Sequence, residues 1–175
     1  MPKKIHLVCN AHLDPIWQWE WEEGAASALS TFKSASDLCD EFDYIFCHNE
    51  VTLYKYIEEY APELFEDIKR HIKEGKWKII GGWYLQPDCN MPCGESFIRQ
   101  IQFGKNYFRK KFGVESKTAY NVDAFGHSAG LVQIMKKCGQ ENCVIVRKGD
   151  DPVPDTHLIW EGLDGSRIKL AALRG

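Results

Sequence analysis

The sequence lacks a long apolar run. After the charged start at Lys3 and Lys4, the first apolar stretch covers only residues 5–8 and is interrupted by His6. A secretory signal needs about 7–15 apolar residues and a membrane-spanning helix about 20. The sequence therefore predicts neither a signal peptide nor a membrane segment, and we expect a cytoplasmic protein without a membrane partner.

A strong excess of charge of either sign is also missing. Lys and Arg number 22 and Asp and Glu 25 among 175 residues, which gives a formal net charge of -3. Binding of nucleic acid requires a clustered basic excess, so we expect no nucleic-acid partner. Hydrophobic residues make up 44% and charged residues 27% of the chain, a balance that excludes disordered, collagen-like and coiled-coil sequences. The length fits one domain with a core of its own.

The cysteines show no clear pairing pattern. Their number, 7, is odd and they are spread along the chain, as is typical of a reducing compartment. Cys89 with Cys93 and Cys138 with Cys143 come close to the spacing of zinc ligands. We interpret both pairs as buried or surface thiols in preference to metal ligands.

Apolar periodicity indicates that strands and helices alternate along the chain. Strands are expected at residues 4–9, 44–47, 77–81, 118–122 and 143–146, and a hairpin at residues 158–160 and 168–173. Helices are expected at residues 25–41, at 50–73 as two helices divided near Pro62, at 96–112 and at 128–138. No repeat or linker interrupts this order. It predicts an α/β fold with a parallel sheet, open or closed into a barrel.

Reactive side chains follow each of the first five expected strands. They are Asn10, His12, Asp14, Trp17 and Trp19; His48, Asn49 and Glu50; Trp83, Asp88, Asn90 and Glu95; Asp123, Phe125 and His127; and Arg147, Asp150 and Asp151. Active sites of parallel α/β folds form at the carboxyl ends of the strands. We therefore expect one functional site at that end of the sheet.

The spacing of His12 and Asp14 is typical of a metal site. An imidazole and a carboxylate two residues apart on an extended loop can face the same way, and zinc accepts both ligand types. Asp123 can reach the same point if the sheet curls. A His-x-Asp pair alone is more often a surface or capping arrangement, but a third group at a strand end favours a metal site.

Aromatic residues are concentrated near the same strand ends. Trp17, Trp19 and Trp21 alternate in the sequence, and Trp83 and Phe125 follow other strands. Such residues can pack in a core, or they can offer flat faces to the C–H side of a sugar ring while neighbouring acids bind its hydroxyls.

Carboxylates suited to hydrolysis are also present, and their spacing does not select among them. Glycosidases use two carboxylates, and Asp88, Asp123, Asp150 and Asp151 are candidates. Hydrolysis by zinc-bound water is equally consistent with the residues.

Four segments resemble glycoside hydrolase family 38, the class II α-mannosidases. Residues 12–17 (His-Leu-Asp-Pro-Ile-Trp) resemble its metal-binding signature and residues 81–88 its Gly-Gly-Trp loop. Residues 121–128 (Asn-Val-Asp-Ala-Phe-Gly-His-Ser) resemble its nucleophile loop, and residues 144–147 the strand with its active-site arginine. The short loop at residues 89–96 is similar to the bacterial and cytosolic branch.

The resemblance implies a role for individual residues. His12, Asp14 and Asp123 would bind zinc, and Asp123 would also be the nucleophile of a retaining α-mannosidase. Trp17 would form a platform for the sugar with Phe125 beside it, and Arg147 would favour the charged form of Asp123.

Asp88 and Trp83 would be further pocket residues. The substrate would be a mannose-containing oligosaccharide, and the fold would be the N-terminal portion of a seven-stranded type of (β/α) barrel.

Two features of the family have no match here. Its fourth zinc ligand, a histidine, and its general acid, an aspartate, follow the arginine strand, whereas His157 is the only histidine after His127. Residues 1–175 are therefore expected to be a partial N-terminal catalytic domain of a longer enzyme, inactive alone, whose open sheet edge allows a homo-oligomer to form.

Two alternatives remain open. The chain can be a self-standing carbohydrate-binding or regulatory module, or a metal-dependent deacetylase or amidohydrolase on a related barrel. The last would require a further pair of metal-binding histidines.

Overall fold

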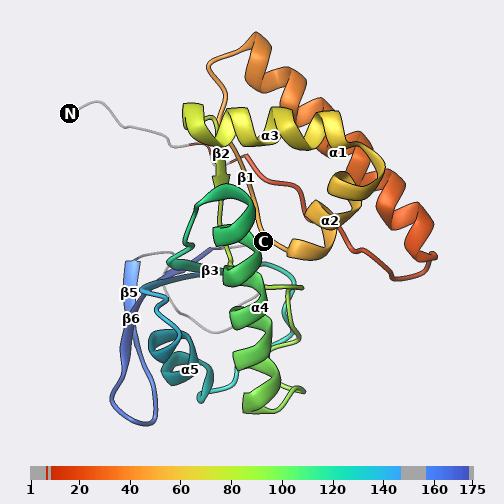
Figure 1. Ribbon diagram of the computed structural model, residues 1–175. Helices are drawn as coiled ribbons and strands as arrows, with labels where there is room; N and C mark the ends of the chain where they lie inside the picture. Colours follow the sequence, from red (N-terminus) through yellow and green to blue (C-terminus); the bar gives the residue numbers. More distant parts are fainter. Residues whose placement is uncertain (1–6, 8, 147–156, 174–175) are drawn as a thin grey trace. The chain divides into compact units, whose positions relative to one another are not determined.

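The computed structural model describes residues 7, 9–146 and 157–173, which fall into two compact units (Figure 1). Unit 1 comprises residues 1–48 and 52–78, and unit 2 comprises residues 49–51 and 79–175. Each unit is described by itself. In the described part of the chain, no helix combines the length and the apolar character needed to cross a bilayer.

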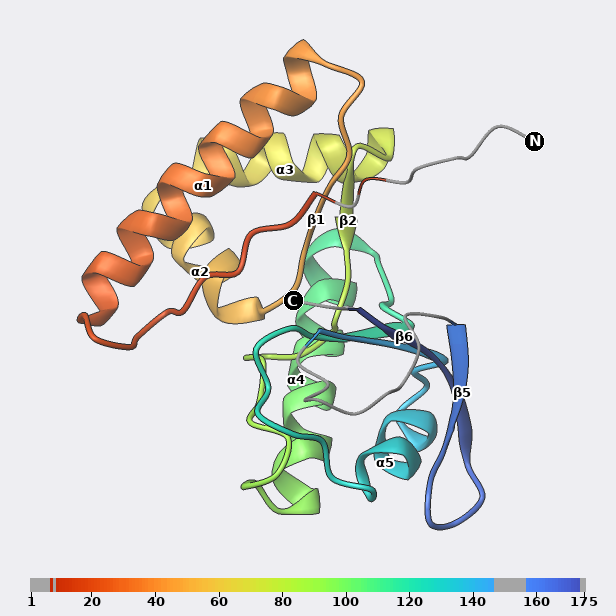
Figure 2. The same cartoon turned by 180° about the vertical axis from the view of Figure 1, so that it is seen from behind.

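Unit 1 packs helices around a short sheet. Its elements are α1 (Trp21–Glu41), β1 (Phe46–His48), α2 (Val51–Tyr60, which begins in unit 2), α3 (Pro62–Glu74) and β2 (Trp77–Ile79, whose last residue belongs to unit 2). β1 is hydrogen-bonded to β2, and Cys9 forms an isolated parallel bridge to Phe46. Helices α1 and α3 lie side by side in both views (Figures 1 and 2). A strand is expected at residues 4–9. Of these, residues 4–6 and 8 lie outside the described residues.

The ends of α3 follow directly from its sequence. Pro62 opens the helix, where its missing N–H costs nothing, and the preceding helix ends at Tyr60. Gly75 closes it in the left-handed conformation with φ 82°, and the N–H of Lys76 donates to the carbonyl of His71. The predicted division of residues 50–73 into two helices near Pro62 is confirmed.

Helix α1 begins at Trp21 and not near residue 25 as expected. Gly24 lies in its first turn, where a Cβ would overlap the backbone of Pro15. The glycine is thus required by the close approach of the loop at Pro15, although its position in the sequence resembles a helix breaker. The contact explains why the pattern placed the start too late.

Unit 2 packs two helices on a four-stranded sheet. Its elements are α4 (Gly94–Phe112), β3 (Thr118–Asn121), α5 (Leu131–Lys137), β4 (Asn142–Ile145), β5 (His157–Glu161) and β6 (Arg167–Ala172). The strand order is β3-β4-β6-β5, with β3, β4 and β6 parallel and β5 antiparallel to β6. The α/β class, the parallel strands and the hairpin are confirmed. The described strands form open sheets, so a barrel stays a prediction.

The core of unit 2 lies between this sheet and α4 and α5. Its buried residues include Phe97, Ile101, Leu131, Cys143 and Leu170. On α4, Gly104 meets the backbone of Gly82, which a Cβ would overlap. The helix therefore rests directly on the chain at residues 82–83, and the loop that follows is anchored to it.

Candidate functional site

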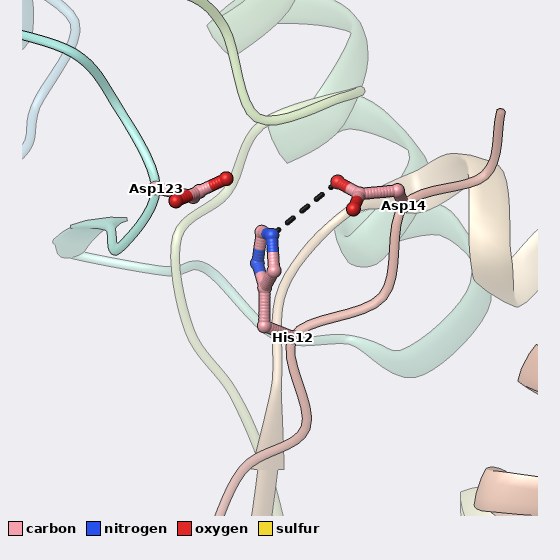
Figure 3. Close-up of side chains that lie close together, drawn as sticks. All are labelled: His12, Asp14 and Asp123. Atoms are coloured by element: carbon pink, nitrogen blue, oxygen red, sulfur yellow. Dashed lines mark ion pairs between the residues drawn. The ribbon is translucent and has the colours of Figure 1, made fainter. Parts of the chain in front are cut away.

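The loop after Cys9 carries the first candidate pair. His12 Nε2 lies 3.3 Å from Asp14 Oδ1, with the two side chains 34% and 39% exposed (Figure 3). The loop is anchored at both ends of this pair: Asn10 Nδ2 donates to the carbonyl of Cys47 at 2.7 Å, and Trp19 Nε1 donates to the carbonyl of Asp14 at 3.2 Å. The structure thus brings an imidazole nitrogen and a carboxylate oxygen together on an accessible loop.

The three alternating tryptophans, Trp17, Trp19 and Trp21, are not fully buried. Trp17 is 65% exposed and meets Trp19 edge to face, with the ring centroids 5.4 Å apart. Trp21 stacks on Tyr60 with centroids 6.4 Å apart and is itself partly exposed. The ring of Trp17 is therefore available to a ligand.

Asp123 belongs to unit 2, two residues beyond the end of β3, and is half-buried. It is the third residue labelled in Figure 3. Three hydrogen bonds join its loop to the loop at residues 86–90: Val122 N–H to Gln86 Oε1 at 3.0 Å, Asn90 Nδ2 to the carbonyl of Phe125 at 2.9 Å, and Ser128 N–H to the carbonyl of Cys89 at 3.0 Å. The backbone that carries Asp123 is consequently held on both sides.

Phe125 projects from the same loop and is 67% exposed. Gly126 follows with φ 95°, and a Cβ there would collide with the side-chain nitrogen of Asn90. The glycine thus permits the turn that leaves the ring of Phe125 at the surface.

Asp88 and Trp83 both make contacts within unit 2. Asp88 Oδ1 accepts hydrogen bonds from the N–H groups of Asn90 at 2.8 Å and Met91 at 2.9 Å, and these bonds lower the pKa of Asp88. Trp83 is fully buried in the core of unit 2, and its Nε1 has no hydrogen-bond partner among the residues that the structure describes. Arg147, Asp150 and Asp151 lie outside the described residues.

Each of the two cysteine pairs combines one buried thiol with one that is more exposed. Burial raises the pKa of Cys89 and of Cys143 to about 12, which keeps both thiols protonated. Cys93 is exposed, and a hydrogen bond with Ser96 lowers its pKa. Since a metal binds the thiolate, these surroundings favour the interpretation of both pairs as thiols.

Two further residues of unit 2, Glu50 and Gln86, are linked by hydrogen bonds to the residue before Asp123. Glu50 is only 4% exposed and has a positive φ of 68°, and its Oε1 accepts a hydrogen bond from Gln86 N–H at 2.9 Å. Sequence reasoning placed Glu50 at a strand end without a role and overlooked Gln86. Neither residue type signals such an environment, because glutamate disfavours positive φ and a lone glutamine is uninformative.

Comparison with known proteins places the chain among glycosyl hydrolases. Residues 2–174 match the family model "Glycosyl hydrolases family 38 N-terminal domain". The chain is 31% identical over 169 residues to alpha-mannosidase G of Dictyostelium discoideum, and 30% identical over 168 residues to alpha-mannosidase 2C1 of Mus musculus. Each alignment covers 94% of this chain and 16% of the relative, so the chain spans about a sixth of their length.

A solved structure supports the same fold. The alpha-mannosidase from Enterococcus faecalis V583 superimposes with a TM-score of 0.85 at 23% identity. The match covers 94% of this chain and 19% of that one.

Proposed function

Because the chain belongs to the N-terminal domain of glycosyl hydrolase family 38, we propose that it supplies the nucleophile and part of the metal site of a retaining α-mannosidase that acts on mannose-containing oligosaccharides. The observation that carries this proposal is the family match over residues 2–174, which includes both loops described above. The names of the relatives, alpha-mannosidases in each case, support the substrate class.

The donor set suits a divalent cation. His12, Asp14 and Asp123 each offer one ligand atom, an imidazole nitrogen and two carboxylate oxygens, which zinc accepts. In unit 1, the nitrogen of His12 and the oxygen of Asp14 already face each other on an exposed loop. When bound, such a cation would supply positive charge that attracts the carboxylate of Asp123 and the hydroxyls of the sugar.

Asp123 would act as the nucleophile. One of its carboxylate oxygens forms a bond with the anomeric carbon while the bond from that carbon to the glycosidic oxygen breaks. The departing oxygen takes a proton from a general acid, and water then releases the sugar from Asp123. Attack on one face followed by attack of water on the other retains the anomeric configuration.

Two aromatic residues are the proposed sugar contacts. Trp17 and Phe125 are the candidates with accessible rings. Asp88, whose Oδ1 accepts two backbone N–H groups, and Trp83, which is enclosed in the core, stay proposed pocket residues. Arg147 is proposed to favour the charged form of Asp123 through its guanidinium. This assignment follows the family resemblance.

The isolated chain is expected not to hydrolyse an alkyl α-mannoside, because the alkoxide leaving group must be protonated as it departs. The family's general acid and fourth ligand have no match in residues 1–175, and general acid–base catalysis contributes about 10²–10⁴-fold. Release of methanol from methyl α-mannoside should equal that of the Asp123→Ala variant. Turnover that the Asp123→Ala change abolishes would contradict the proposal and place an acid within this chain.

We also propose self-association through the edge strand β5 in a cytoplasmic setting. β5 is the outer strand of its sheet and carries the exposed Ile159, and an unpaired edge is a template for another strand. All 7 cysteines are free thiols, which suits a reducing compartment.

Light scattering after size exclusion should detect a dimer whose population falls when Ile159 is replaced by lysine. A monodisperse monomer at high concentration would exclude the association.

A further inference from the structure

Gln86 connects two segments of unit 2 that are distant in sequence. Its side-chain Oε1 accepts the N–H of Val122 at 3.0 Å, and its own N–H donates to Glu50 Oε1 at 2.9 Å. Val122 directly precedes Asp123. The connection Glu50–Gln86–Val122, which we term the relay, therefore ends at the backbone of the proposed nucleophile.

The relay takes over where the sheet ends. The ladder between β3 and β4 stops at Asn121, so Val122 is the first residue whose N–H lies beyond it. A side-chain oxygen from another loop then satisfies this N–H. The φ and ψ angles of Val122 set the direction in which the next residue leaves the strand, and the bond from Gln86 restrains them.

Glu50 is held in an unfavourable state that its surroundings impose. It combines a left-handed φ of 68° with a carboxylate that is nearly removed from water. Both features are disfavoured for glutamate, and such strain is concentrated at functional sites. The N–H of Val51 donates to the carbonyl of Trp83 at 3.2 Å, which ties the strained segment to the chain that leads to Gln86.

We propose that Gln86 is a positioning residue for Asp123, seated in turn by Glu50. The inference rests on the proposed role of Asp123 as a metal ligand and nucleophile. Gln86 acts through the backbone: it fixes Val122, and thereby the direction of the Asp123 carboxylate, before a cation or sugar arrives. Outer groups of this kind typically change metal affinity by about 10–100-fold when they are removed.

The test compares Gln86→Leu, which removes the acceptor, with Gln86→Glu, which retains an oxygen at the same place. Gln100→Leu is the matched control, because Gln100 Oε1 accepts the N–H of Leu85, the residue before Gln86, at 2.9 Å without reaching Val122. Zinc affinity is measured by competition with a chromogenic chelator, and exchange of the Val122 amide proton by NMR. Far-UV circular dichroism checks that each variant folds.

We expect Gln86→Leu to weaken zinc binding about 10-fold or more and to accelerate exchange at Val122. Gln86→Glu should restore both quantities, and Gln100→Leu should alter neither. Equal losses in Gln86→Leu and Gln86→Glu, or unchanged exchange at Val122, would overturn the relay.

A separate variant distinguishes failure of the relay from failure of the proposed function. If Asp123→Asn weakens zinc binding and Gln86→Leu does not, the relay alone is wrong. If Asp123→Asn binds zinc as tightly as the unaltered chain, or if the unaltered chain binds no zinc, the ligand assignment is wrong. The proposed role of the relay is then wrong as well.

Discussion

Replacing Asp14 by alanine is expected to remove nearly all zinc binding by the chain. Asp14 is proposed as a direct ligand, so its loss should exceed the about 10–100-fold effect of outer groups. The His12 imidazole, which lies 3.3 Å from Asp14 Oδ1, would lose the oxygen with which it is paired. Metal analysis of the purified protein and chelator competition both measure the effect.

Asp37→Ala is the matched control for this change. Asp37 is also a partly exposed carboxylate of unit 1, but it forms an ion pair with Lys33 on the surface of α1. Its removal alters the net charge by the same amount as Asp14→Ala and should leave zinc content unchanged. Equal zinc in the Asp14→Ala protein and the unaltered chain would remove Asp14 from the ligand set.

The parts of the fold that were predictable from sequence depend on local signals. Pro62 and Gly75 mark the ends of α3 because proline lacks an N–H and glycine tolerates positive φ. The β5–β6 hairpin could be placed because Gly165, with φ 78°, stands between two apolar runs. In each case the residue determines the conformation of its own neighbourhood.

The parts that were not predictable depend on packing between distant segments. From the sequence, Trp83 could pack in a core or face a sugar ring, and the structure buries it in the core of unit 2. Asp88 stays a predicted pocket residue, and the sequence did not reveal that its Oδ1 accepts two backbone N–H groups of its own turn. A strand end identifies which residues can reach a site, while the direction of each side chain follows from contacts that one sequence does not reveal.

In the candidate site, too, local features were predictable from sequence and long-range contacts were not. The pairing of His12 with Asp14 follows from their spacing of two residues on an extended loop. The support that Glu50 and Gln86 give to Val122 joins residues 36 positions apart, and no local pattern announces it. Candidate residues for direct contact with a ligand were therefore easier to nominate than residues proposed to act through the backbone.

Replacing Trp77 by alanine is expected to cause the largest loss of stability. Trp77 is buried in unit 1, edge to face with Phe32 and Phe46 at centroid distances of 5.3 and 4.7 Å. Deleting such a ring leaves a cavity and costs about 3–5 kcal/mol. Because a domain is stable by about 5–15 kcal/mol, the free energy of unfolding measured with urea should fall by a large fraction.

Two variants separate the contributions to this loss. Trp21→Ala removes a ring that is 41% exposed, and it should cost less than about 1.5 kcal/mol because little cavity remains. Tyr54→Phe leaves the packing intact but removes the hydroxyl that accepts the Trp77 Nε1–H at 2.9 Å. A buried donor without a partner costs about 1–3 kcal/mol, so Tyr54→Phe should lie between the two tryptophan variants. If Trp77→Ala were no more destabilising than Trp21→Ala, burial of the ring would not be the main contribution of Trp77 to stability.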